Sequence, residues 1–71
     1  PLALRDDLMR GVSLITAPGD PVYAKGFLRS LARAAGDTAL AAAVEETHTA
    51  FDRAKLARMI EDRLAALSSL A

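Results

Sequence analysis

Apolar residues recur at helical spacing along the chain, and no stretch shows the alternation of a half-buried strand. Side chains three or four positions apart lie on one face of a helix, so such a stripe marks the buried side. The first stripe consists of Leu4, Leu8, Val12 and Ile15. It predicts a helix over residues 2–15, and Gly11 on the same stripe predicts a close crossing with another helix.

Proline, glycine and aspartate mark the ends of the next two helices. Asp20 followed by proline is typical of a helix start, since aspartate caps free backbone N–H groups and proline fits the first turn. Gly36 suits a helix C-terminus, and Asp37 directly after it suits the start of the next helix. The predicted helices cover residues 21–35 and 38–46, joined by a very short corner.

The helix over residues 21–35 carries two unlike faces. Its predicted apolar face consists of Tyr23, Phe27, Leu28 and Leu31. Its other side carries a basic stripe at every fourth position, formed by Lys25, Arg29 and Arg33. A solvated face whose long stems shield the core is the favoured interpretation. The alternatives are contact with an acidic protein partner, with acidic residues of this same chain, or with phosphates.

The apolar stripe changes direction in the last third of the chain. Leu40 and Val44 set one direction, and a straight helix would continue that line through His48 and Phe51. The apolar set that follows is rotated from this line by roughly 140° at 3.6 residues per turn. One straight helix cannot bury both sets, so the pattern predicts a bend.

We place this break at residues 47–49, where two β-branched threonines also weaken helicity. Thr49 and Asp52 have the spacing of a capping box, with aspartate in place of the usual glutamate. The break predicts a last helix over residues 50–69. The alternative is one kinked helix over residues 38–70.

The last helix has a broad apolar face that three short helices need not cover. This face consists of Leu56, Met59, Ile60, Leu64, Leu67 and Leu70. The first helix adds Leu2, Met9 and Leu14 outside its main stripe. Since exposed apolar patches mark interfaces, we expect these two helices to form a surface that binds a second copy or another protein.

Composition limits the chain to one small helical domain, residues 1–71. Folding of a chain of this size buries only roughly 60% of the surface that the unfolded chain exposes, so tight packing or self-association must supply stability. There is no cysteine, which excludes disulfides and thiolate metal sites. The net charge is zero, which disfavours a dedicated nucleic-acid binder.

No apolar run reaches the roughly 18 residues that span a membrane, and no signal peptide is visible. We therefore expect a cytoplasmic protein without membrane contact. The excess of arginine over lysine, with abundant alanine and leucine, is typical of a bacterial chain. Because the sequence begins at Pro1, we expect either a removed initiator methionine or a piece of a longer polypeptide.

Catalysis and metal binding find little support in the residue types. The chain has one histidine, and no serine lies near it in sequence. Glu45, His48 and Asp52 would share a face of a continuous helix, and Glu-x-x-His occurs in di-iron bundles. Such sites need two of these pairs and two further carboxylates, so a partly exposed histidine beside acidic neighbours is the favoured interpretation. We expect no enzyme activity, no metal and no cofactor.

The tight corner at Gly36 suggests a helix-turn-helix. The segment over residues 27–36, made mostly of Leu, Ala and Arg, resembles the start of the DNA-binding part of some addiction-module antidote proteins. The resemblance implies a small dimeric DNA-binding regulator. Beyond Gly36 the chain departs from that pattern, because the expected glycine of the turn is missing. Residues 38–46 also hold no Arg, Lys, Asn or Gln that could read base edges.

Together these patterns predict an all-α protein, built as a small four-helix bundle or an orthogonal helical array. We expect it to act as a non-enzymatic protein–protein interaction or oligomerisation module of a regulatory or adaptor type. The alternative is the antitoxin-like DNA-binding regulator, in which the basic stripe would contact the DNA backbone.

Overall fold

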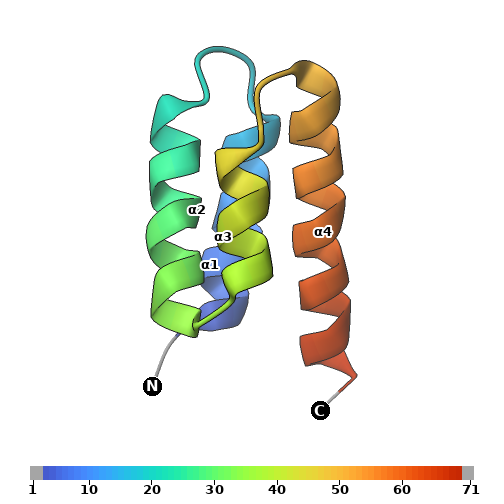
Figure 1. Cartoon of the computed structure of the whole chain (residues 1–71). Helices are drawn as coiled ribbons and strands as arrows, with labels where there is room; N and C mark the ends of the chain where they lie inside the picture. The colour runs from blue at the N-terminus through green and yellow to red at the C-terminus, as the bar shows by residue number, and fades with distance from the viewer. Residues whose placement is uncertain (1–2, 70–71) are drawn as a thin grey trace.

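The computed structural model describes residues 3–69, which contain four helices and no strand. The helices are α1 (Leu4–Thr16), α2 (Val22–Ala35), α3 (Thr38–Glu45) and α4 (Ala50–Ser68). They run alternately up and down as an antiparallel bundle, and the start of α1 and the end of α4 lie at the same end of the bundle (Figure 1). The all-α prediction is confirmed, with the bundle in place of an orthogonal array.

The helices pack in a ring. α1 lies against both α2 and α4, α2 also packs on α3, and the contact between α3 and α4 is the smallest of the four. Apolar side chains from all four helices meet in one core. The buried apolar residues are Leu8, Ile15, Ala24, Leu28, Leu31, Ala32, Leu40, Val44, Leu56, Ala57 and Ile60.

The contact between α1 and α2 depends on a glycine. A Cβ atom at Gly11 would overlap the side chain of Leu28, which is fully buried. The backbone of α1 therefore approaches α2 more closely than any other residue would allow. This confirms the close crossing predicted for Gly11.

The corner between α2 and α3 is built as its residue types predict. Gly36 adopts a left-handed conformation with φ of 69°, which glycine tolerates without a steric penalty. The carboxylate of Asp37 accepts a hydrogen bond from the backbone N–H of Leu40 at 3.0 Å. Asp37 therefore caps α3 one residue after Gly36 ends α2.

The predicted break between residues 47 and 49 is also confirmed, and the single kinked helix is excluded. Thr49 accepts from the N–H of Asp52 at 3.1 Å, and the Asp52 carboxylate accepts from the N–H of Thr49 at 3.1 Å. This is the full capping box. The hydroxyl of buried Thr47 donates to the carbonyl of Ala43 at 2.8 Å, which closes the end of α3.

Two predictions for α2 are wrong in detail, one about its apolar face and one about where it begins. Tyr23 is 64% exposed, and Ala24 and Ala32 lie on the buried face of α2 in its place. α2 packs between α1 and α3, so its buried face is centred on Leu28. This face also includes Ala24, Leu31 and Ala32, and Tyr23 lies outside it. α2 also begins one residue late, at Val22, whose N–H donates to the Asp20 carboxylate at 3.0 Å.

Candidate interaction surface

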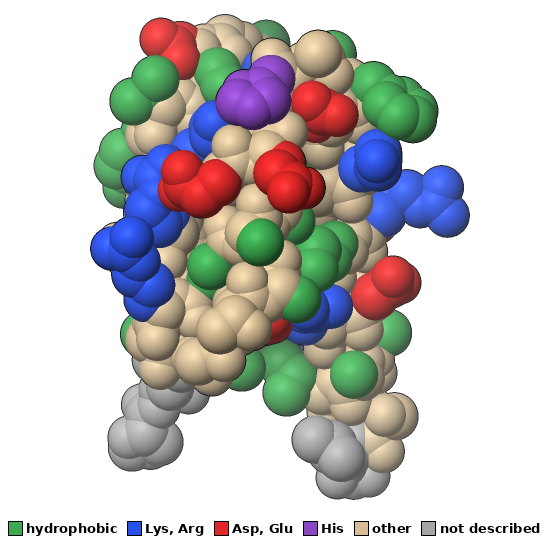
Figure 2. Space-filling model, viewed as in Figure 1, with side chains coloured by type: hydrophobic (Ala, Val, Ile, Leu, Met, Phe, Trp, Pro, Cys, Tyr) green, Lys and Arg blue, Asp and Glu red, His purple; other side chains and the backbone are tan. Residues whose placement is uncertain are grey.

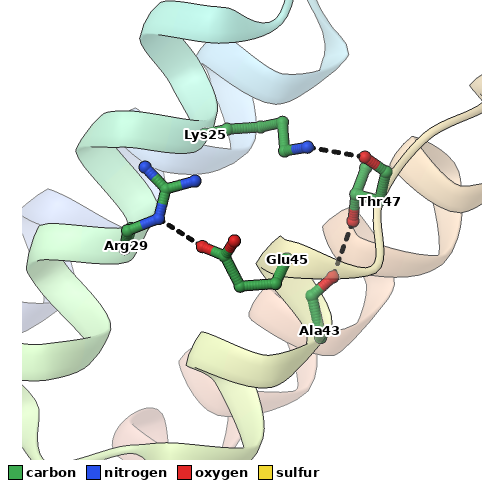
Figure 3. A network of polar contacts seen from close by, with 5 residues as sticks. All are labelled: Lys25, Arg29, Ala43, Glu45 and Thr47. Carbon is green, nitrogen blue, oxygen red and sulfur yellow. Dashed lines mark hydrogen bonds and ion pairs between the residues drawn. The ribbon is translucent and has the colours of Figure 1, made fainter.

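The basic stripe of α2 faces the end of α3. The ammonium group of Lys25 donates to the backbone carbonyl of Thr47 at 2.8 Å, and the Arg29 guanidinium forms an ion pair with Glu45 (Figure 3). The Arg29 hydrogen bond holds the pKa of Glu45 below its ordinary value. Of the three predicted contact residues, Lys25 and Arg29 are thus engaged within the bundle, while Arg33 is exposed.

Arg53, for which the sequence pattern predicted no role, binds the end of α1 and the loop between α1 and α2. Arg53 of α4 donates from Nε to the carbonyl of Ile15 and from Nη1 to that of Gly19, each at 3.0 Å, and from Nη2 to Ala17. Helix C-termini leave carbonyls without partners, and the last turn of α1 has no basic residue of its own. The signal in the sequence was a charged residue on the apolar stripe of residues 50–69.

An ion pair that the sequence pattern did not predict joins α4 to the corner between α2 and α3, at the opposite end of the bundle. Arg63 donates from Nε and Nη2 to the two carboxylate oxygens of Asp37, at 2.9 and 3.1 Å. The two parallel bonds make a bidentate pair, which is stronger and more directional than a single contact. The Arg63 hydrogen bond lowers the pKa of Asp37, and its bond from Leu40 adds to the effect.

The predicted apolar surface of the last helix is only partly free. Leu56 is 2% exposed and Ile60 is not exposed at all, so the expectation that they bind a partner is corrected: both lie in the core. The physical reason is that α1 packs along α4 and covers this face. Met59, Leu64 and Leu67 are half-buried against the core, and Leu70 lies outside the described residues.

The apolar residues of the first helix outside its main stripe also differ in how far they are exposed. Met9 is exposed and Leu14 is half-buried, whereas Leu2 lies outside the described residues. The contact between α1 and α4 therefore occupies much of the surface that the sequence assigned to partner binding. Partner binding stays a prediction for the residues that remain accessible.

One of the hollows on the surface lies on the other side of α4, where its contact with α3 is small. A groove of about 300 Å³ runs between these two helices. It is lined by Ala43, Glu46, Thr47, Asp52, Lys55, Leu56 and Met59. Its apolar floor is made by Leu56 and Met59 of α4 and by Ala43 of α3, so the groove joins the core directly.

The α3 rim of this groove is acidic, whereas the α4 rim carries both Lys55 and the Asp52 carboxylate that caps α4. Exposed Glu46 stands at the end of α3, and exposed Lys55 stands on α4. Figure 2 shows acidic side chains over the upper part of α3 and basic side chains over α4 beside them. The Lys55 ammonium lies 5.6 Å from the ring centre of Phe51, which is 72% exposed. The α4 rim therefore continues into an exposed aromatic side chain.

The residues considered for a metal serve structural roles. Glu45 pairs with Arg29, and the Asp52 carboxylate accepts from the backbone N–H groups of His48 and Thr49. Within residues 3–69, no three His, Asp or Glu side chains are grouped as a metal ion would require. In the same range, no helix has the length and apolarity needed to cross a membrane.

Comparisons with protein families, with characterised proteins and with solved structures found no match for this chain. A function must therefore be inferred from the groove and from the charges around it.

Proposed function

We propose that this protein is a non-enzymatic helical interaction module that binds a protein partner along the groove between α3 and α4. The observation that carries the proposal is the open seam between these helices. The seam leaves the side chains of Ala43 and Met59 partly accessible beside charged residues. Elsewhere, Lys25 binds the Thr47 carbonyl and Arg63 binds Asp37 within the bundle.

The shapes of the two helices favour a helical partner. α3 has 8 residues beside the 19 of α4, and the wall that it offers to the groove includes Ala43. A small side chain lets a partner helix approach closely, and an apolar groove with polar edges is a common seat for an amphipathic helix. Met59, half-buried on α4, is a flexible side chain that adapts to such a surface.

The DNA-binding alternative has less support from the same contacts. Lys25 and Arg29 already bind Thr47 and Glu45, so they would have to leave these partners to reach a phosphate. α3, the helix that would enter the major groove, carries no Arg, Lys, Asn or Gln. The non-enzymatic part of the proposal rests on the lone histidine and the missing cysteine.

Site-specific photo-crosslinking in living cells tests the proposal. A photoreactive amino acid replaces Ala43, which lines the groove, and a matched variant carries it at Arg58, an exposed residue of α4 that does not line it. We expect discrete protein adducts from position 43 and none from position 58. Equal labelling from both positions, together with a mobility shift of duplex DNA that weakens steeply with salt, would favour the regulator instead.

A further inference from the structure

We propose that the occupant of the groove is a second copy of this chain, so that the protein forms a two-fold symmetric dimer through α3 and α4. This inference rests on the function proposed above and names its partner. The groove has two features that make it complementary to itself, namely the charges on its rims and the sizes of the side chains along its walls.

Glu46 and Lys55 form a self-complementary pair of charges, while the third charged residue of the groove, Asp52, is engaged as the cap of α4. Glu46 stands on the α3 rim and Lys55 on the α4 rim, and neither belongs to an ion pair among the described residues. A two-fold axis parallel to these helices, in front of the groove, lays the α3 of one copy over the α4 of the other. Because this rotation sets the α3 rim of each copy against the α4 rim of the other, we infer that Glu46 of each copy pairs with Lys55 of the other, twice in one interface.

The sizes of the side chains are also complementary across the two-fold axis. The α3 wall presents Ala43, whereas the α4 wall presents Met59. The rotation that exchanges the two walls sets the methionine of one copy over the alanine of the other, so a large side chain meets a small one on both sides of the axis.

Neither long-range charge nor chain size opposes this association. The net charge is zero, so two copies do not repel each other as they approach. A 71-residue chain without disulfides has a small core, and covering the half-buried Met59 from water extends it.

Charge reversal tests the dimer on the intact chain. Light scattering and sedimentation over a dilution series should show a monomer–dimer equilibrium for the unchanged protein. Glu46→Lys or Lys55→Glu alone places like charges together twice, and each should weaken the dimer about tenfold or more. The double variant restores both pairs and should regain the dimer. An equimolar mixture of the two single variants should form a heterodimer.

Arg58→Glu is the matched control, because Arg58 is exposed on α4 but does not line the groove. It should leave the dimer unchanged, and thermal unfolding of every variant confirms that the fold is kept. A monomer at all concentrations would overturn the inference, as would a dimer that ignores both single reversals. If the monomer still gives adducts to another protein from position 43, the interaction module survives and only the second copy is excluded.

Discussion

Gly11 of α1 lies so close to Leu28 of α2 that the added methyl group of an alanine would overlap the leucine side chain. Leu28 is fully buried, so its side chain would have to shift against the packed core. We therefore expect Gly11→Ala to destabilise the bundle by about 1–3 kcal/mol, although alanine is the better helix former. Chemical denaturation followed by circular dichroism measures the change.

Gly26 provides the control for this substitution. It lies within α2, but no atom stands within 4 Å of a Cβ placed there. Gly26→Ala should raise the free energy of unfolding by up to about 1 kcal/mol, since alanine reduces the freedom of the unfolded chain. We therefore expect the two substitutions to change the free energy of unfolding in opposite directions. A loss of similar size at both positions would show that the close crossing is not the cause.

Arg53 should contribute more to stability than any exposed arginine. Arg53→Ala removes the donors to the carbonyl of Ile15 in the last turn of α1 and to those of Ala17 and Gly19 in the loop, and should cost about 1–2 kcal/mol. Hydrogen exchange should accelerate first in the loop between α1 and α2. Arg58→Ala, an exposed change on the same helix, should stay within about 0.5 kcal/mol. Equal losses for both variants would contradict the role of Arg53.

The pair of Asp37 and Arg63 makes stability depend on pH. The pKa of Asp37 is lowered in the folded protein, mainly by the Arg63 hydrogen bond, so its contribution is present above the ordinary carboxyl pKa. That contribution is lost as the pH falls through the lowered value. Hydrogen bonds from Arg29 and from the His48 backbone lower the pKa of Glu45 and Asp52 respectively, so they act in the same direction.

Asp37→Asn isolates this pair, because asparagine keeps an oxygen that can accept from the N–H of Leu40. We expect a loss of about 1 kcal/mol near neutral pH, where the carboxylate is ionised. The difference from the unchanged protein should shrink as the pH is lowered below about 4. Thermal unfolding at a series of pH values measures it. A constant difference over this range would rule out the ion pair as its source.

Two residues of the basic stripe should respond differently to charge reversal. Lys25→Glu removes the donor to the Thr47 carbonyl and sets a carboxylate beside it, so it should lower the unfolding midpoint measurably. Arg33→Glu, on an exposed position, should change the unfolding free energy by less than about 0.5 kcal/mol. If both variants unfold like the unchanged protein, the Lys25 contact is not formed in solution.

Local signals in the sequence were enough for the helices and their ends. Gly36, Asp37, Thr49 and Asp52 act within a few residues of themselves, so their roles could be predicted from type and spacing alone. The change in direction of the apolar stripe predicted the break after α3 for the same reason. Tyr23 was misplaced because an apolar side chain next to a buried stripe does not reveal whether a neighbouring helix covers it.

The sequence by itself determined a four-helix chain with one sharp corner, one break and a glycine suited to close packing. Only the tertiary structure decided which charges are engaged and which apolar face stays open. The long-range contacts of Arg53 and Arg63 join residues far apart in the chain, and no local pattern encodes them. α1, rather than α3, packs closely along α4. This packing buries Leu56 and Ile60 and leaves a groove beside Met59, between α3 and α4.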